Sequence, residues 1–153
     1  MWIYDLSGTT AMRRLTFGGN NRFPIWSSDS KRVAFQSDRE GAPAIFWQAA
    51  DGTGAAERLT KPEQGTAHVP DSWSPKSDEF LFDVVKGTDV SLWTFALQKN
   101  EATLFGAVHT RGIPTGAVFS PDGHWVAYTS NDPPPATVYV RPFPATGAKY
   151  QLF

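Results

Sequence analysis

An internal repeat constrains the fold of this chain more than any other feature. Three segments superimpose, at residues 25–35, 72–82 and 118–128, and each holds an aromatic or apolar residue, a serine, a polar turn and a closing aromatic residue. The closing residues Phe35, Phe82 and Tyr128 are 47 and 46 residues apart. A fixed period of this length indicates that one supersecondary unit occurs several times along the chain.

Each copy has the pattern of a β-hairpin followed by two more strands. In the third copy, Ser120-Pro121-Asp122-Gly123 suits a tight turn, because Pro fixes φ, Asp accepts backbone hydrogen bonds and Gly tolerates positive φ. The first two copies carry weaker turn chemistry at this point. Third strands are predicted at 44–48, 91–97 and 137–141, and fourth strands around 57–60, 102–105 and 149–152. Each repeat is therefore predicted to be a four-stranded antiparallel meander.

The composition supports an all-β class. The chain has six Trp, four Tyr and eleven Phe, with 13 Gly and 12 Pro, which favours strands joined by tight turns. We find no segment of about 11 residues free of Gly and Pro that shows helical periodicity. Residues 2–6 match a third strand and residues 13–16 a fourth, so the N-terminus adds half a copy and the expected total is fourteen strands.

A twisted four-stranded unit that is apolar on both faces must stack on its neighbours, and radial stacking of such units is a β-propeller. We expect one propeller segment over residues 1–153, with a half blade at 1–23 and full blades at 24–69, 70–113 and 114–153. A ring of four such blades needs about 184 residues. The chain has 153. It is therefore expected to expose apolar end faces and to self-associate, or to be an excerpt of a longer protein. One arrangement pairs the half blade with the first hairpin of a second chain's last blade, which gives a six-bladed dimer and displaces the segment from about Thr137 onward.

Charge and cysteine content exclude several classes of partner. Fourteen Lys and Arg face fifteen Asp and Glu, a formal charge of −1, so there is no strong field for nucleic acid. No apolar run approaches the roughly 18–20 residues of a membrane-spanning helix, and membrane insertion is not expected. The chain has no cysteine, which excludes a disulfide framework and a thiolate zinc site.

The segments "WSSDSKRVAFQSD", "WSPKSDEFLF" and "FSPDGHWVAYTSN", each followed by an aromatic strand, resemble the WD40-like repeat of TolB-type β-propellers. The last stretch, from Ser120 to Pro144, is similar to propeller repeats that follow the kinase domain in bacterial serine/threonine kinases. The resemblance implies a scaffold, used in binding proteins, in kinase sensor regions and in prolyl-oligopeptidase-type hydrolases. It also implies an extracytoplasmic location.

Residues with catalytic or metal-binding chemistry are few, and no cofactor is expected. His68, Asp71 and Ser72 are the residue types of a hydrolase triad, but three residues within five positions leading into one strand cannot form the relay geometry. The histidines at 68, 109 and 124 are predicted on connections at different faces, which disfavours a metal site. Gly52-Thr53-Gly54 precedes a strand and lacks the third glycine of a dinucleotide-binding loop. The tryptophans at 26, 47, 73, 93 and 125 are predicted to pack between blades.

In a propeller, rigid blades hold loops on one face, and those loops make the contacts. Here the loops that link successive blades and the loops between second and third strands are expected to share a face. The predicted contact residues are Arg22, Asp38, Arg39, His68 and Arg111. Three functions stay open: a non-catalytic scaffold that binds a protein or peptide, the gating propeller of a hydrolase whose catalytic domain lies elsewhere, and catalysis by the segment itself.

Overall fold

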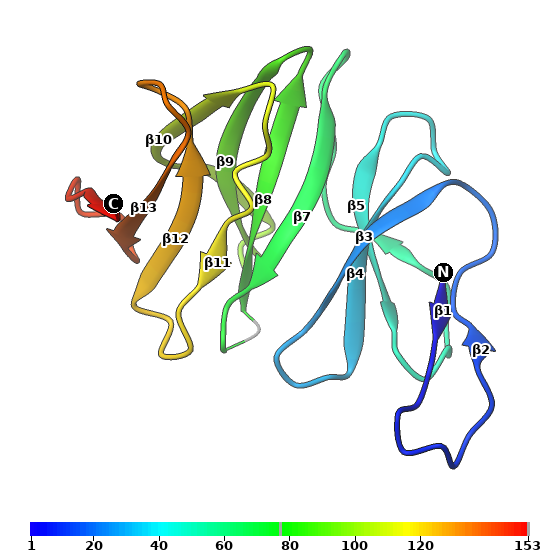
Figure 1. The fold of residues 1–153 in the computed structure, drawn as a ribbon. Coiled ribbons are helices and arrows are strands. Elements are labelled where there is room, and N and C mark those ends of the chain that lie inside the picture. Colours follow the sequence, from blue (N-terminus) through cyan, green and yellow to red (C-terminus); the bar gives the residue numbers. More distant parts are fainter. Residues whose placement is uncertain (77, 153) are drawn as a thin grey trace.

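The computed structural model describes residues 1–76 and 78–152, and Figure 1 shows their arrangement. Within these ranges there are fourteen strands in four antiparallel sheets and no helix, which confirms the all-β class. The half blade contains β1 (Trp2–Ile3) and β2 (Arg13–Arg14). Blade 1 contains β3 (Asn21–Trp26), β4 (Arg32–Ser37), β5 (Ala44–Ala49) and β6 (Glu57–Arg58). Blade 2 contains β7 (Ala67–Trp73), β8 (Glu79–Lys86), β9 (Asp89–Ala96) and β10 (Glu101–Arg111). Blade 3 contains β11 (Val118–Phe119), β12 (Trp125–Ser130), β13 (Thr137–Pro142) and β14 (Tyr150–Leu152).

The three full blades share one strand order and one register. Each is a meander in which neighbours in sequence are neighbours in the sheet. The closing aromatic residue of each hairpin lies opposite an aromatic residue of the third strand: Phe35 opposite Phe46, Phe82 opposite Trp93, and Tyr128 opposite Tyr139. Equivalent positions in the three blades can therefore be compared directly. The predicted repeat is confirmed as an incomplete all-β propeller.

The fourth strand of blade 2 is longer than the pattern predicts. A bulge between Leu104 and His109 lets β10 continue to Arg111 and pair along β9. A bulge absorbs extra residues without ending a strand. His109 and Arg111 therefore belong to a strand, and His68 belongs to β7, whereas the sequence pattern predicts all three on connections.

The register of the half blade differs from the predicted one. Leu15 N donates to Met1 O at 3.0 Å, as Leu59 N donates to Ile45 O at 2.8 Å. The amine of Met1 donates to Thr16 Oγ1, as Ile45 N donates to Thr60 Oγ1. Met1 is therefore the equivalent of Ile45, and the third-strand match begins at Met1 and ends at Ile3 rather than covering residues 2–6.

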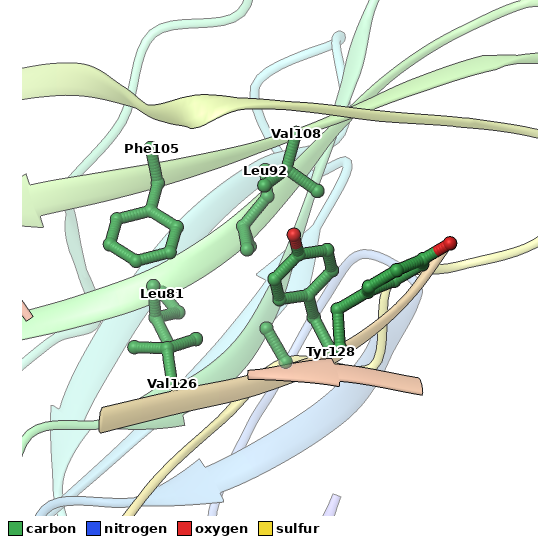
Figure 2. Packing of buried hydrophobic residues seen from close by; sticks show 8 residues of the cluster. Leu81, Leu92, Phe105, Val108, Val126 and Tyr128 are labelled. Carbon is green, nitrogen blue, oxygen red and sulfur yellow. The ribbon is translucent and has the colours of Figure 1, made fainter. Parts of the chain in front are cut away.

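The hydrophobic core consists of three clusters, each between two successive sheets. The clusters are Leu15, Val33, Phe35, Ala44, Phe46 and Ala50; Ala34, Ile45, Trp73, Phe80, Phe82 and Phe95; and Leu81, Leu92, Phe105, Val108, Ala117, Val126, Tyr128 and Tyr139. Figure 2 shows the last cluster, where side chains of blades 2 and 3 gather between the sheets. Each blade thus has a front face toward the preceding sheet and a back face toward the following one, because strand residues alternate between faces.

The back face of blade 3 is exposed. Ile45 and Leu92 are 0% exposed, whereas Val138, at the equivalent position of blade 3, is 42% exposed. Trp125 and Tyr150 also lie exposed on blade 3, with ring centroids 5.9 Å apart. The same position is buried wherever a following blade covers it, so the expected apolar end face is confirmed. Of the five tryptophans predicted to pack between blades, Trp26 and Trp125 are 50% and 39% exposed. Trp26 lies on the face of blade 1 that the half blade covers only in part, and Trp125 lies on the uncovered back face of blade 3.

Candidate functional site

A cleft lies where the connections of two blades meet. Its volume is ≈ 900 Å³, and we call it the loop cleft. Its walls come from the β6–β7 connection, the turn between β8 and β9, the end of β10, and the β12–β13 loop. The residues that line it are Glu63, Thr66, Val84, Lys86, Asp89, Val90, Ser91, His109, Thr110, Arg111, Asn131, Asp132 and Pro134. One connection between blades, two loops between second and third strands and the end of β10 thus line this cavity.

The loop cleft has apolar side chains beside charges of both signs. Val84 and Val90 supply apolar surface, while Lys86 and Arg111 supply cations and Glu63, Asp89 and Asp132 supply carboxylates. Arg111 Nε lies 3.4 Å from Asp89 Oδ1, with both side chains mostly exposed (83% and 70%). Such an exposed ion pair contributes little to stability. The guanidinium of Arg111 keeps donors available to a ligand.

A backbone clamp fixes one wall of the loop cleft. Asn131 accepts hydrogen bonds from Thr110 Oγ1 at 2.7 Å and Arg111 N at 2.8 Å, and its Nδ2 donates to Arg111 O at 2.8 Å. A side-chain amide that donates and accepts in this way replaces a partner strand for the end of β10. The backbone of Arg111 is therefore held on one side by β9 of its own blade and on the other by Asn131 of blade 3.

Blade 1 has an equivalent clamp, built with a carboxylate. Asp38 accepts bonds from Asn20 N and Asn20 Nδ2, both at 2.7 Å, and these bonds lower the pKa of Asp38. Asp38 occupies the position of Asn131, one residue beyond the equivalent serines Ser37 and Ser130. The clamp holds the connection that leads into β3, as Asn131 holds the connection that leads into blade 3.

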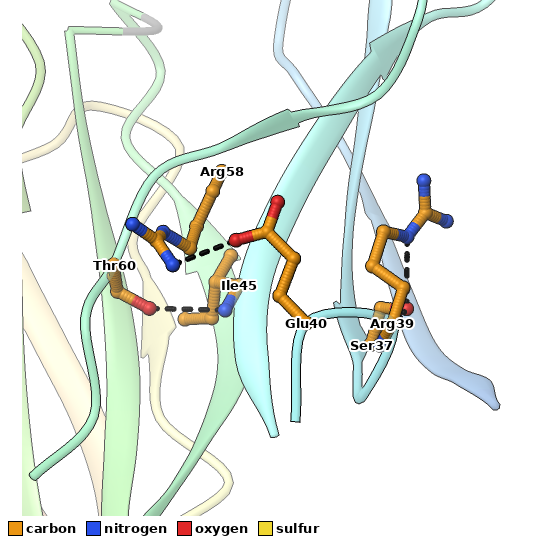
Figure 3. Close-up of polar contacts among 6 residues, drawn as sticks. All are labelled: Ser37, Arg39, Glu40, Ile45, Arg58 and Thr60. Carbon is orange, nitrogen blue, oxygen red and sulfur yellow. Dashed lines mark hydrogen bonds and ion pairs between the residues drawn. The ribbon is translucent and has the colours of Figure 1, made fainter. Parts of the chain in front are cut away.

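Arg39 is part of the same structure. Its Nε donates to Ser37 Oγ at 3.1 Å and its Nη2 donates to Asn21 Oδ1 at 2.9 Å. Figure 3 shows the Arg39–Ser37 bond next to the ion pair of Glu40 and Arg58. The guanidinium also lies 5.0 Å from the ring centroid of Phe46. These contacts commit Arg39 to holding its own loop.

The five predicted contact residues do not form one cluster in the loop cleft. Arg111 lines it, and Arg22, Asp38, Arg39 and His68 do not. Arg22 is exposed on β3. His68 is 8% exposed, with its ring centroid 5.1 Å from that of Phe82, and burial lowers the pKa of His68 to about 4. His68 is therefore a neutral core residue behind the surface. Lys86 and His109 line the loop cleft, although the sequence pattern suggested His109 only as a metal ligand and predicted neither residue as a contact residue.

A buried acid pair at the junction of blades 2 and 3 was also missed. Thr115 donates to Asp83 from N at 2.9 Å and from Oγ1 at 2.6 Å, and its Oγ1 lies 3.4 Å from Asp71 Oδ2. Burial and the neighbouring Asp83 carboxylate raise the pKa of Asp71 to about 9, so Asp71 holds a proton and donates it to Asp83. An aspartate inside the apolar run of β8 was the available signal.

In blade 1, a side-chain amide makes the contact with the next blade that the acid pair makes in blade 2. Gln36, at the position of Asp83, donates from Nε2 to His68 O of the next blade at 2.9 Å. Both side chains join the second strand of one blade to the start of the next blade. The pair is therefore placed as a structural link between blades.

The three triad-type residues each have a different partner. His68 packs on Phe82, Asp71 belongs to the buried acid pair, and Ser72 Oγ accepts a bond from Phe119 N at 3.3 Å. Over residues 1–76 and 78–152, no three His, Asp or Glu side chains are grouped so as to hold a metal ion. None of the described segments is a helix long and apolar enough to cross a membrane.

Comparison with solved structures identifies the fold. TolB from Acinetobacter baumannii superimposes with a TM-score of 0.82 and 25% identity, over 99% of this chain and 36% of that one. A protein assigned as TolB from Agrobacterium tumefaciens superimposes with a TM-score of 0.81 and 17% identity, over 99% of this chain and 54% of that one. The chain thus spans between a third and just over half of the length of these proteins. No protein-family model matches the sequence.

A prolyl endopeptidase is more distantly similar, with a TM-score of 0.64, 18% identity and 95% coverage of this chain, but only 25% of that one. A chain of the nidogen/laminin complex has a TM-score of 0.67 at 11% identity, over 93% of this chain and 52% of that one. These likenesses show the fold alone. The predicted resemblance to TolB-type β-propellers is confirmed.

Proposed function

We propose that this TolB-type propeller segment is a non-catalytic scaffold that binds a segment of a protein or peptide in the loop cleft. The observation that carries the proposal is the cavity of ≈ 900 Å³ at which one connection between blades, two loops and the end of β10 meet. Clefts of this size, with apolar walls and a few polar groups, are typical binding sites.

The chemistry of the loop cleft fits a peptide. Val84 and Val90 offer apolar surface for one or two side chains, and Lys86 and Arg111 offer donors for a carboxylate or for backbone carbonyls. The clamp at Asn131 holds one wall before a ligand arrives. A preformed wall lowers the conformational entropy that binding must overcome.

The test selects peptides from a random display library on the immobilised chain and measures their affinity for charge-reversal variants. We expect Lys86→Glu and Arg111→Glu to weaken the selected peptides by about tenfold or more, because a charge-assisted hydrogen bond contributes about 1.5–3 kcal/mol. Lys76→Glu is the matched control. Lys76 lies just before β8 and Lys86 is its last residue, so the two lysines lie at opposite ends of this strand. Equal binding by wild type and Lys86→Glu, or an equal loss with Lys76→Glu, contradicts the proposal. Cleavage of the selected peptides contradicts the non-catalytic part.

The runner-up is the gating propeller of a hydrolase. The likeness to a prolyl endopeptidase, which covers 95% of this chain, favours it. Sequencing the gene that encodes this segment tests the gating role. An α/β-hydrolase segment with a G-x-S-x-G motif in the same reading frame supports it. A parent gene that encodes no such segment removes this candidate.

The proposal also includes association through the two ends of the stack. Val138 and Tyr150 are exposed at one end, and Trp2 and Tyr4 at the other. Contiguous exposed apolar surface marks interaction sites. Light scattering at micromolar concentration tests this part, and a monodisperse monomer removes it.

A further inference from the structure

The half blade has an inner edge that no described strand occupies. The third strands β5, β9 and β13 are paired on both sides, while β1, their equivalent, is paired with β2 alone. The first two strands of a blade have no counterpart in this sheet. The position that β4 occupies beside β5 is therefore open beside β1.

The backbone of Trp2 points into this open position. Leu15 N donates to Met1 O, so Met1 and Leu15 form a hydrogen-bonded pair. Antiparallel pairs alternate between hydrogen-bonded and non-hydrogen-bonded. Trp2 and Arg14 are then a non-hydrogen-bonded pair, and the N–H and C=O of Trp2 are directed to the free edge.

A side-chain surface next to this edge is also uncovered. Trp26 of β3 lies opposite Val33 and so shares the front face of blade 1 with that core residue. Trp26 is 50% exposed, whereas Trp73, at the equivalent position of blade 2, is 7% exposed. Trp73 is covered because β7 packs against β3, β4 and β5 of the preceding blade and its ring lies 6.1 Å from that of Trp47. The half blade lacks the counterparts of β3 and β4, so Trp26 stays bare.

We infer that the slot between β1 and the front of β3 binds the first β-hairpin of a further propeller repeat, which completes a fourth blade. The hairpin adds a strand to β1 through the backbone of Trp2 and packs its back face on Trp26. The repeats in this chain define its chemistry: an apolar residue at the central back position of the second strand, which is Ala34 in blade 1, Leu81 in blade 2 and Ala127 in blade 3. This site is separate from the loop cleft, and its test does not depend on the proposed peptide binding.

The experiment supplies the hairpin in cis. Met1 is equivalent to Val138, so residues 115–137 fused directly ahead of Met1 reproduce the natural connection from β12 to β13. A tether raises the local concentration of the hairpin into the millimolar range or above. We expect the fusion to raise the urea midpoint, to slow exchange of the Trp2 amide by about a hundredfold or more, and to reduce acrylamide quenching of Trp26. A fusion with the same 23 residues in scrambled order is the control for composition.

Two variants separate strand addition from general apolar contact. Trp2→Pro removes the N–H at the free edge, while Trp2→Leu keeps it and removes the ring. In the chain without the fusion, both should unfold at the same urea concentration, because pairing with β2 does not use this N–H. In the fusion, Trp2→Leu should keep most of the gain in midpoint and Trp2→Pro should lose it. The inference is overturned if the scrambled fusion gives the same gain, if neither fusion changes the midpoint, or if both variants behave alike in the fusion.

Discussion

The buried acid pair gives a sharp prediction for the pH dependence of stability. Replacing Asp71 by Asn keeps a hydrogen-bond donor toward Asp83 and an acceptor for the backbone N–H of Ala117, which Asp71 contacts in the wild type. The variant therefore preserves the link between blades 2 and 3 and removes the titration of Asp71, while Asp83 keeps its buried carboxyl. We expect Asp71→Asn to flatten the loss of stability that the wild type shows as pH rises above neutral.

The magnitude follows from proton linkage. The pKa of Asp71 is raised from 3.8 to about 9 in the folded chain, so between these values the folded state holds one proton more than the unfolded state. The free energy of unfolding then falls by about 1.4 kcal/mol for each pH unit gained. His68 has the opposite effect: its pKa is lowered from 6.5 to about 4, so stability falls as pH drops through that window. The two effects oppose each other below pH 6.5. Above it the loss of stability due to Asp71 stands alone, at roughly 3 kcal/mol from pH 6.5 to 8.5.

The assay is urea unfolding followed by tryptophan fluorescence at half-unit steps from pH 4.5 to 8.5. For the wild type, the free energy of unfolding should change little between pH 4.5 and 6.5 and decrease above pH 6.5. For Asp71→Asn it should be constant above pH 6.5 and decrease as the pH falls below that value. Glu79→Gln is the control, because burial raises the pKa of Glu79 at a site outside the blade 2–3 link, and it should leave the alkaline limb unchanged. Parallel curves for wild type and Asp71→Asn above pH 6.5 would refute the shared proton.

Three further predictions concern single contacts. Gly19→Ala should destabilise the chain by about 1–2 kcal/mol more than Gly18→Ala. Both glycines have positive φ, but a Cβ at Gly19 meets Ser37 Oγ at 2.9 Å, whereas one at Gly18 meets nothing within 4 Å. Equal urea midpoints for the two variants would contradict this prediction. In the Asp71→Asn background, His68→Leu should abolish the loss of stability below pH 6.5. If the double variant still loses stability there, a group other than His68 causes the loss. Thr115→Val should cost about 1–3 kcal/mol at pH 7, because it removes a hydroxyl donor from the buried acid pair, and a midpoint within error of wild type would contradict this.

The strands and their order were predictable because the same sequence pattern occurs three times along the chain. A pattern at residues 25–35 that returns at 72–82 and 118–128 predicts equivalent structure three times, so the weak turn sequences of the first two copies did not matter. The extent of single strands was less predictable. The bulge in β10 depends on pairing with β9, and this pairing moves His109 and Arg111 from a connection into a strand.

The candidate site was predictable only in outline. Arg111 lines the loop cleft, whereas Asp38 and Arg39 hold their own loops and His68 packs on Phe82. A charged residue in a loop has the same sequence signal whether it binds a ligand or clamps the backbone. Only the positions of the neighbouring donors and acceptors separate these roles.

The all-β class, the four-stranded unit and the surplus half copy follow from the amino-acid sequence, since they depend on periodicity, on turn residues and on the need of each apolar face for a neighbour. The contacts across blades depend on the folded structure: Asp71 and Asp83 of blade 2 meet Thr115, and Asn131 of blade 3 meets Arg111. The open edge beside Trp2 likewise becomes visible only in the sheet arrangement. Such contacts join residues 20 to 44 positions apart, and their distances depend on how one blade packs on the next. Local sequence pattern carries no information on that packing angle.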